Sequence, residues 1–309
     1  MFQGMDYVYE VYKEQSFSKA AKNLYISQPS LSAAVKKAEQ KIGFPIFDRS
    51  SNPIRLTELG KEYIHAIEAI MDVENGFQNY VQDMQDMRNG SVSIGGTNFY
   101  ASYVLPPLIS RFTEKYPHIR VNLIEAYTTK LADMLFSGAL DLLIDNKAMD
   151  PAVFGKRFFC EDHLLLVVPS HFASNLAVRN YALTALDIRE SRHLNSRIPP
   201  IPLEVFQKDP FLLLKSGNDT RIRADKICHH ARFVPDIRFE LEQQITAYNL
   251  SRCGIGISFC GDTLICHVPE DKNLLYYKLD NRDAIRDVNF YFKKNRYMTK
   301  IITEFLDLV

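Results

Sequence analysis

The stretch FSKAAKNLYISQPSLSAAVKKAEQKIGFPIFDRS, residues 17–50, carries side chains whose chemistry suits nucleic-acid recognition. One face of this stretch carries its apolar residues. The polar side chains of Gln28, Ser30, Ser32 and Lys36 fall mostly on the other face. A glutamine can form two hydrogen bonds with the edge of an adenine, whereas serine hydroxyls and lysine ammonium groups suit phosphate oxygens. These residue types therefore indicate contact with double-stranded DNA.

Two helical runs joined by a short polar turn must position these side chains. The first run places Ala20, Ala21 and Leu24 on one face. The second run follows Ser27, whose side chain can accept hydrogen bonds from free backbone N–H groups, and Pro29 is tolerated in a first helical turn. Its apolar residues then recur at helical spacing: Leu31, Val35, Ala38 and Ile42. A buried first helix followed by an exposed polar helix predicts a helix-turn-helix, whose second helix enters the major groove.

The charge of this region differs from that of the whole chain. The 309 residues contain 37 Lys and Arg and 37 Asp and Glu, so the formal net charge is zero. Residues 18–55 contain seven basic and two acidic side chains, which is a surplus of five positive charges. A phosphate-binding surface needs such a surplus, although an ordinary solvated face could also carry it.

A small wing is expected next. The turn-forming residues 50–53, Ser-Ser-Asn-Pro, separate two short apolar pieces at 45–47 and 54–56. This pattern predicts a two-stranded wing with Arg49 and Arg55 beside its tip. Either arginine could touch DNA next to the second helix or form a surface ion pair, for example with Asp48.

A long helical pattern follows from residue 57 to residue 88 without a proline. Apolar or aromatic residues recur in it in steps of three and four: Leu59, Tyr63, Ile67, Ile70, Val73, Phe77, Tyr80, Met84 and Met87. A helix cannot bury so narrow a stripe on itself, so we expect a partner helix from a second copy of the chain. Packing of the stripe on the chain's own downstream domain is the alternative.

Strand and helix patterns alternate from residue 90 onward, which predicts an α/β domain with a parallel sheet covered on both faces. Strands of a first set are expected near 92–94, 120–125 and 140–144. Strands of a second set are expected near 163–168, 211–214, 237–239 and 254–258, followed by 274–279 and 288–292. Residues 173–207, with three prolines near 200, predict a long surface excursion.

Polar side chains stand where several of these strands end. Thr97 follows the first strand, Thr128 or Thr129 opens a later helix, and Ser216-Gly217-Asn218 follows a strand of the second set. Ligands of open α/β sheets bind at this edge, where free N–H groups favour carboxylate or other anionic groups. Each polar side chain could instead simply cap a helix. The residues assigned to a small organic effector are Thr97, Asn98, Phe99, Thr128, Thr129, Ser216, Gly217 and Asn218.

The sequence lacks the motifs of common cofactor enzymes. Gly95-Gly96 is not part of a G-x-G-x-x-G fingerprint, and no G-x-x-x-x-G-K-[ST] loop occurs. Cys228-His229-His230 has metal-binding side chains, but neighbours on a helix point apart, so a surface histidine pair is expected. We therefore expect no catalytic residue, no metal site and no cofactor besides the effector.

Cysteine usage and hydropathy indicate a cytoplasmic protein. The N-terminus resembles no signal peptide, and no apolar run reaches the length of a membrane span. The five cysteines are irregularly spaced, which indicates reduced thiols. Cys253, Cys260 and Cys266 are expected to be buried and inert, with oxidant sensing as the alternative.

With these motifs the chain resembles the LysR-type transcriptional regulators along nearly its whole length. Residues 17–50 followed by IRLTELG are similar to the family's DNA-binding pattern, and VSIGGTNFYASYVLPPLISRFTEKYPHIRVNLIEA with SGALDLLI is similar to the start of its effector domain. The resemblance departs at Tyr25, Ala33 and Ile46, and Ala33 removes a side chain that could have read a base.

The resemblance implies a winged helix-turn-helix (1–58), a dimerising linker helix (59–89) and an effector domain (90–309) like a type 2 periplasmic binding protein. Lobe 1 would contain 90–162 and 267–309, and lobe 2 would contain 163–266. The implied partners are promoter DNA, a second copy, a tetramer formed from two dimers, and RNA polymerase. The residues assigned to DNA are Ser18, Ser27, Gln28, Pro29, Ser30, Ser32, Lys36, Arg49 and Arg55. A solute-binding module or small-molecule enzyme, with an N-terminal part that mediates assembly, is the alternative.

Overall fold

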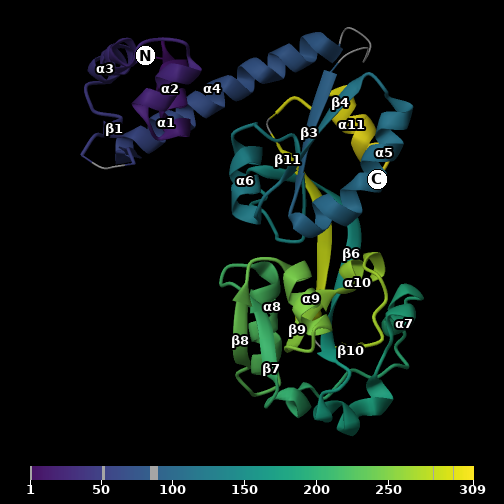
Figure 1. Cartoon of the computed structure of the whole chain (residues 1–309). Helices are drawn as coiled ribbons and strands as arrows, with labels where there is room; N and C mark the ends of the chain where they lie inside the picture. Colours follow the sequence, from purple (N-terminus) through teal and green to yellow (C-terminus); the bar gives the residue numbers. More distant parts are fainter. Residues whose placement is uncertain (1, 51–52, 84–89, 281, 295) are drawn as a thin grey trace. The chain divides into compact units, whose positions relative to one another are not determined.

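The computed structural model describes residues 2–50, 53–83, 90–280, 282–294 and 296–309. The chain divides into two compact units, Met1–Val81 and Gln82–Val309 (Figure 1). Met84 and Met87 of the predicted apolar stripe lie outside the described residues.

The N-terminal unit contains the predicted helix-turn-helix and wing. Helix α1 spans Met5–Glu14, α2 spans Phe17–Asn23 and α3 spans Gln28–Ile42. Strand β1 (Phe47–Asp48) pairs antiparallel with β2 (Arg55–Leu56). Small side chains on α2 let the helices approach, because Ala20 and Ala21 share a buried core with Leu31 and Val35 of α3. Both predictions are therefore confirmed.

Helix α4 spans Glu58–Asp83, and its apolar stripe has two parts. Tyr63, Ile64 and Ile67 are buried in the core of the N-terminal unit. Farther along the helix, Val73 is 74% exposed and Phe77 is 67% exposed. The expectation that the whole stripe faces a partner helix needs correction, because its first turns pack within their own unit.

The C-terminal unit begins with a sheet of strands in the order β4-β3-β5-β11-β6. Its strand bounds are Gly90–Gly96 for β3, Ile119–Glu125 for β4, Leu142–Asp145 for β5, Phe154–Pro169 for β6 and Ile285–Lys293 for β11. The accompanying helices are the π-helix η1 (Tyr100–Val104), α5 (Leu105–Lys115), α6 (Thr128–Phe136) and α11 (Lys300–Asp307). Aromatic contacts join α5 and α11, because the rings of Phe112 and Phe305 lie 5.3 Å apart.

A second set of strands continues the same sheet through β6, which pairs with β9 and β10. The bounds are Pro210–Leu214 for β7, Asp236–Leu241 for β8, Ile257–Gly261 for β9 and Leu274–Lys278 for β10. The helices of this part are α8 (Asp219–His230), α9 (Gln244–Arg252) and α10 (Asp262–His267), with the 3-10 turn η5 at Arg282–Ala284.

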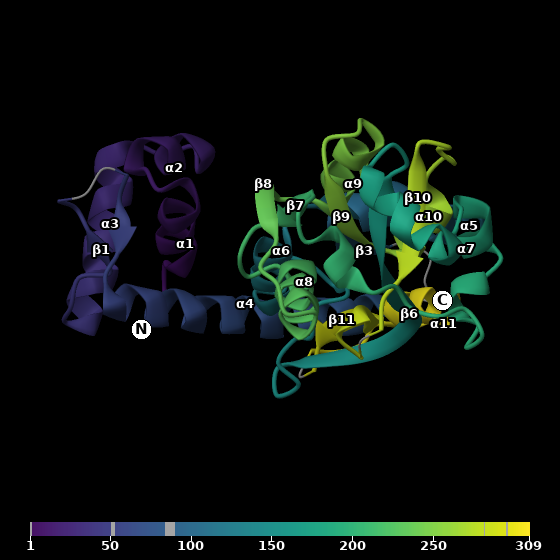
Figure 2. The same cartoon turned by 90° about the horizontal axis from the view of Figure 1, so that it is seen from below.

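Strands β6 and β11 join these two parts of the C-terminal unit and lie side by side in Figure 2. Residues Phe154–His163 of β6 pair with β11, whereas Leu164–Pro169 pair with β9 and β10. All of these pairings are antiparallel, whereas β3 pairs parallel with β4 and β5, and β7 pairs parallel with β8 and β9. The sheet is therefore mixed: the expectation of parallel strands is confirmed for these four pairs and wrong for β6, β10 and β11. The first part of β6 escaped prediction because it is only partly buried and carries charged side chains among its apolar ones.

Residues 173–207 also differ from the expectation of a surface excursion. They contain the 3-10 helices η2 (Ala173–Tyr181), η3 (Arg192–Leu194) and η4 (Leu203–Phe206) and the helix α7 (Ala185–Arg189). Val178, Ile188 and Phe206 are buried. The segment is therefore packed onto the sheet rather than extended over the surface.

Candidate DNA-binding surface and effector site

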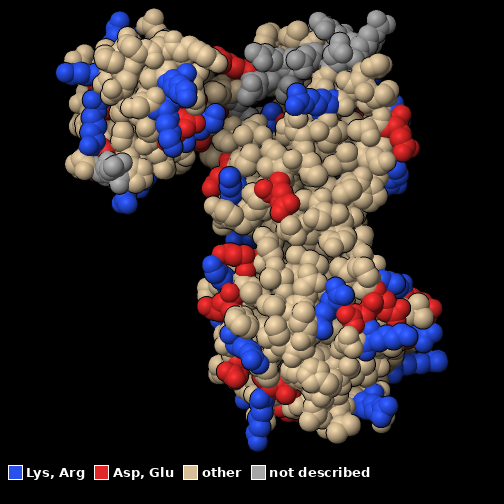
Figure 3. All heavy atoms as spheres, viewed as in Figure 1, with Lys and Arg blue, Asp and Glu red and all other residues tan. Residues whose placement is uncertain are grey.

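The residues assigned to DNA lie on α2, on α3 and in the wing. Ser32 is half-buried, and the others are exposed: Ser18, Ser27, Gln28, Pro29, Ser30, Lys36, Arg49 and Arg55. Figure 3 shows Lys and Arg side chains spread over the surface of this unit, with few Asp and Glu among them. The exposed face and the local basic surplus suit a polyanion.

Two of these hydroxyl groups shape the start of α3. Ser27 Oγ accepts a hydrogen bond from the Ser30 N–H at 3.2 Å, and the two Oγ atoms lie 2.7 Å apart. Ser27 therefore caps the helix, which satisfies a backbone group that the helix itself cannot. Gln28 is exposed beside this cap, at the N-terminal end of α3. In recognition helices, the residues at this end contact the base edges in the major groove.

Arg49 is held against its own unit by two contacts. Its Nη2 lies 3.1 Å from Glu39 Oε2, and its Cζ lies 5.2 Å from the centre of the Phe17 ring. Glu39 Oε1 also accepts hydrogen bonds from the backbone N–H groups of residues 46 and 47, at 3.0 and 3.3 Å. Glu39 therefore holds the wing against α3 through these hydrogen bonds, and its ion pair with Arg49 adds a further contact.

Tyr25, which was not assigned to DNA, stands out in the turn between α2 and α3. Its side chain is 96% exposed, and its φ of 54° lies in the left-handed region. That conformation is unfavourable for most residues other than glycine, asparagine and aspartate. An exposed ring beside α3 is a candidate contact for the DNA backbone, and its exposure could not be read from the sequence.

The C-terminal unit contains a cavity of about 170 Å³ where its two sets of strands meet. The predicted effector residues that line it are Thr97, Phe99, Thr128, Thr129, Ser216, Gly217 and Asn218. Asn98 is absent from the lining because its amide donates a hydrogen bond to Glu125 Oε1 at 2.8 Å. Phe99 lines the cavity and is also part of the core, where its side chain is only 6% exposed.

Helix starts converge on this cavity with different capping. Asn218 caps α8 by accepting a hydrogen bond from the Thr220 N–H at 2.9 Å. Tyr127 precedes α6 and Gln243 precedes α9, and neither makes a side-chain cap. The first N–H groups of α6 and α9 therefore remain available to a ligand, and the helix dipole favours an anionic group there.

Charged groups of both signs line the cavity. The Thr128 hydroxyl and the Lys147 N–H donate hydrogen bonds to Asp145 at 2.8 and 2.7 Å, and burial raises the pKa of this carboxyl group. On the opposite side, Lys215 forms an ion pair with Glu242. Thr128 therefore orients an acidic side chain and does not cap its helix.

A buried ion-pair network lies directly behind the cavity. Arg286 of β11 contacts Asp162 of β6 at 2.8 Å, Asp219 of α8 at 3.2 Å and the Thr220 hydroxyl at 2.8 Å. The Arg286 side chain is 1% exposed. Burial of the guanidinium by itself lowers the pKa of Arg286. The nearby carboxylate of Asp162 outweighs this effect, so the pKa lies above its ordinary value.

Tyr100 and Thr220, which sequence reasoning also placed near this site, line the cavity as well. Sequence reasoning missed the following lining residues: Tyr127, Asp145, Asn146, Lys147, Leu214, Lys215, Asp219, Glu242, Gln243 and Gln244. Asp145 ends β5, with Asn146 and Lys147 directly after it, and Glu242–Gln244 directly follow β8, as the predicted polar residues follow their strands. The rule that was applied to the other strand ends could therefore have found both groups.

The cysteines are free, and only some of them match the expected burial. Burial raises the pKa of Cys160, Cys228 and Cys260 to about 12, which makes these thiols poor nucleophiles at neutral pH. Cys253 and Cys266 are exposed, so the expectation of burial is wrong for these two.

Family models match both parts of the chain. The model described as LysR substrate binding domain matches residues 85–309, and the model described as bacterial regulatory helix-turn-helix protein, lysR family, matches residues 2–61. The chain belongs to the LysR family of transcriptional regulators. This LysR-type protein therefore combines a DNA-binding helix-turn-helix with a domain of the kind that binds a small effector in the family.

Relatives and solved structures agree with this assignment. The HTH-type transcriptional regulator YcgK of Bacillus subtilis (strain 168) is 28% identical, over 98% of this chain and 92% of the relative. A probable RuBisCO transcriptional regulator of Gracilaria tenuistipitata var. liui is 27% identical, over 96% and 91% of the two chains.

Among solved structures, a full-length variant of OxyR from Pseudomonas aeruginosa has a TM-score of 0.70 at 20% identity, covering 99% of this chain and 93% of that one. Full-length CbnR in complex with its target DNA has a TM-score of 0.62 at 17% identity, covering 100% and 98%. These likenesses support the fold of the LysR-type chain. No helix in the described ranges is both long and apolar enough to cross a membrane.

Proposed function

We propose that this LysR-type regulator binds operator DNA as a dimer through the start of α3 and the wing. We also propose that a small organic effector with an anionic group, bound in the cavity of the C-terminal unit, controls this binding. The cavity carries the proposal, because predicted polar turns from both sets of strands line one space beside helix starts without side-chain caps.

The DNA part of the proposal assigns base reading to Gln28 and phosphate contact to Lys36 and Arg55. Each phosphate contact that is removed should lower the slope of log K against log salt by about one. Binding to the chain's own upstream DNA is measured by fluorescence anisotropy over a range of salt concentrations. Lys36→Ala should weaken binding to all sequences alike, whereas Gln28→Ala should cost about 1–3 kcal/mol at one base position.

Gln40→Ala is the matched control, because Gln40 is an exposed glutamine near the other end of α3. Arg49→Ala is a less direct probe, since it also removes a group that holds the wing. If Gln28→Ala and Gln40→Ala bind alike to the operator and to mutated operators, the assignment of base reading is wrong.

The effector part of the proposal rests on hydrogen bonds and charge. The N–H groups at the starts of α6 and α9 would bind an anionic group, and Thr97 and Ser216 would contribute hydroxyl groups. Asp145 and Glu242 lie in the same cavity, so the effector also needs a hydrogen-bond donor or a positive charge on another part of the molecule. An amino-acid-like zwitterion or a hydroxy acid meets both requirements.

A thermal-shift screen of small carboxylates, amino acids and hydroxy acids would identify such a compound. Thr97→Val and Thr129→Val should then weaken its binding, whereas Thr113→Val, which changes a hydroxyl on α5 that bonds to the Ile109 carbonyl oxygen, should not. Equal affinities in all three variants would contradict the cavity as the effector site.

The proposed dimer pairs the exposed part of the stripe on α4 with the same stripe of a second copy. Two copies would place two α3 helices on the half-sites of one operator, and dimers could pair into a tetramer on longer sites. We further propose that the protein acts in the cytoplasm on promoter DNA, near RNA polymerase, and catalyses no reaction. Specific DNA binding separates this function from that of a pure solute-binding module.

A further inference from the structure

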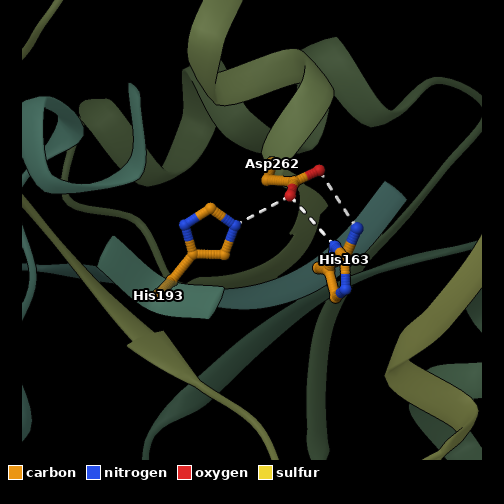
Figure 4. A group of neighbouring side chains, drawn as sticks. All are labelled: His163, His193 and Asp262. Carbon is orange, nitrogen blue, oxygen red and sulfur yellow. Dashed lines mark hydrogen bonds and ion pairs between the residues drawn. The ribbon is translucent and has the colours of Figure 1, made fainter. Parts of the chain in front are cut away.

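Two histidines and an aspartate from distant segments meet in the C-terminal unit, away from the effector cavity (Figure 4). His163 lies on β6, His193 in η3, and Asp262 at the start of α10. Asp262 Oδ2 lies 3.2 Å from His163 Nδ1 and 2.8 Å from His193 Nε2. One potential ligand atom from each residue lies within 4.8 Å of the other two, and among the described residues this is the group with the donors of a metal site.

The spacing of these atoms suits a small divalent ion. Zinc binds imidazole nitrogen and carboxylate oxygen at about 2.0–2.2 Å in a tetrahedral arrangement, which places the ligand atoms roughly 3.3–3.5 Å apart. The two separations from Asp262 Oδ2, 2.8 and 3.2 Å, need to widen by a few tenths of an ångström, and a ligand atom of each histidine lies within 4.8 Å of the other. Small side-chain rotations can supply that movement.

The ligands are held in place before any ion arrives. His193 is 3% exposed and Asp262 is 9% exposed. Asp262 Oδ1 accepts a hydrogen bond from the His163 backbone N–H at 3.0 Å, which fixes the carboxylate. The other ring nitrogen of His163, Nε2, lies 2.9 Å from Glu161 Oε1. A carboxylate on the far nitrogen of a ligand histidine orients the ring and raises its basicity as a ligand.

The charges around the group favour a cation. Glu161, Asp162 and Asp262 supply three carboxyl groups, and Arg286 supplies a guanidinium group, which is bound to Asp162. A cavity of about 260 Å³ also borders both histidines, with Lys278, Asp280 and Arg282 farther along its wall. This cavity gives an ion a path to the site and leaves room for water as an additional ligand.

We propose that His163 Nδ1, His193 Nε2 and Asp262 Oδ2 bind a divalent transition metal, with zinc as the best match. Two imidazoles and one carboxylate leave at least one coordination position for water or an exogenous ligand. The sequence offered no metal motif because the ligands are 30 and 69 residues apart. This site is distinct from the proposed effector cavity, since no residue lines both cavities.

Direct metal titration of the full chain tests this proposal. Chelator-treated protein is titrated with CoCl₂, and ZnCl₂ is then added. Wild type should bind one cobalt per chain with the visible absorption of tetrahedral cobalt, and zinc should displace it. Asp262→Asn, which keeps the size of the side chain, and His163→Gln should each lower the affinity by about 100-fold or more, since changes in the outer shell alone cost about 10–100-fold.

The double variant His229→Ala/His230→Ala is the matched control, because it removes two exposed histidines of α8. It should bind cobalt like wild type. Failure of wild type to bind one equivalent would overturn the proposal, and so would unchanged affinity in Asp262→Asn. Loss of binding in the His229/His230 variant would overturn it as well. Thermal unfolding of each variant shows whether a loss of metal binding is a loss of folding, and where one of the two site variants fails to fold, the other decides.

Discussion

Replacing Phe77 on α4 with aspartate should dissociate the proposed dimer. A phenylalanine side chain buries about 150–250 Å² in a core or interface. Phe77 is 67% exposed, so roughly 130 Å² of its surface is available to a partner helix. At about 25 cal/mol per Å² this is about 3 kcal/mol per copy, and about 6 kcal/mol for the two copies of a symmetric dimer.

A loss of about 6 kcal/mol corresponds to a rise of roughly 10⁴-fold in the dimer Kd. Sedimentation equilibrium should therefore show Phe77→Asp as a monomer at concentrations where wild type is a dimer. Binding to DNA with two half-sites should weaken as well, whereas the thermal stability of the N-terminal unit should stay nearly unchanged, because the side chain is exposed there.

Phe158→Asp is the matched control, because Phe158 is 56% exposed on β6. It should sediment like wild type. Two results would refute the reasoning: a Phe77→Asp protein that remains a dimer, or a Phe158→Asp protein that dissociates to the same degree. Either result would assign the dimer to a surface other than the exposed stripe.

Three further changes test local features of the fold by urea denaturation. Tyr25→Asn should stabilise the N-terminal unit by about 0.5–1 kcal/mol, because asparagine tolerates the φ of 54° better; a loss of stability would show that the ring makes a compensating contact. Gly60→Ala should destabilise by about 1–3 kcal/mol in spite of a better helix propensity, because the new Cβ would lie 2.1 Å from the carbonyl oxygen of Ile46; a gain of stability would contradict this close packing. A hydrogen bond from Arg252 lowers the pKa of Asp271, so this carboxylate stabilises the fold above the unfolded pKa of about 4 and ceases to do so as the pH falls further. Asp271→Asn should therefore cost about 0.5–1 kcal/mol at pH 7, a modest figure because Arg252 is 38% exposed, and less at pH 3; an equal cost at both pH values would rule out the charge as its cause.

The sequence predicted those elements whose local signals agree with their packing. The capping serine, the proline and the spacing of Leu31 and Val35 all indicate a helix from residue 28, and α3 begins there. A helix that opens at Thr128 or Thr129 was likewise predicted, and α6 spans Thr128–Phe136. In α3 the capping serine, the periodicity and the glycine at position 43 indicate the same boundaries, so no tertiary information was needed there.

The features that the sequence did not predict depend on tertiary contacts. The first part of β6 is a strand because it pairs with β11, which lies more than 100 residues later in the chain. Residues 173–207 look polar and rich in proline, yet Val178 and Phe206 reach the core from 3-10 turns that have no hydrophobic period. The effector residues were predictable as strand ends, but the position of Asp145 among them depends on the hydrogen bond from Thr128.

The Arg286 network limits how the C-terminal unit can respond to an effector. Arg286 on β11 joins Asp162 on β6 to Asp219 on α8, and removing one partner of such a buried ion pair costs about 3–5 kcal/mol. Allosteric coupling energies are typically about 1–3 kcal/mol, so the binding of an effector cannot offset the loss of this network. We therefore expect a response that keeps the contacts of Arg286 with Asp162 and Asp219.

The remaining freedom lies in the ladder between β6 and β11 and on the far side of the cavity. The ladder is irregular between Val288 and Asn289, and such irregularities locally increase the twist of a strand pair. A small rotation about this point would change the distance between Asp145 on one side of the cavity and Glu242 on the other while it keeps the contacts of Arg286. An effector that bridges these two sides has different contacts before and after such a rotation, which is the condition for a ligand to shift an equilibrium between two states.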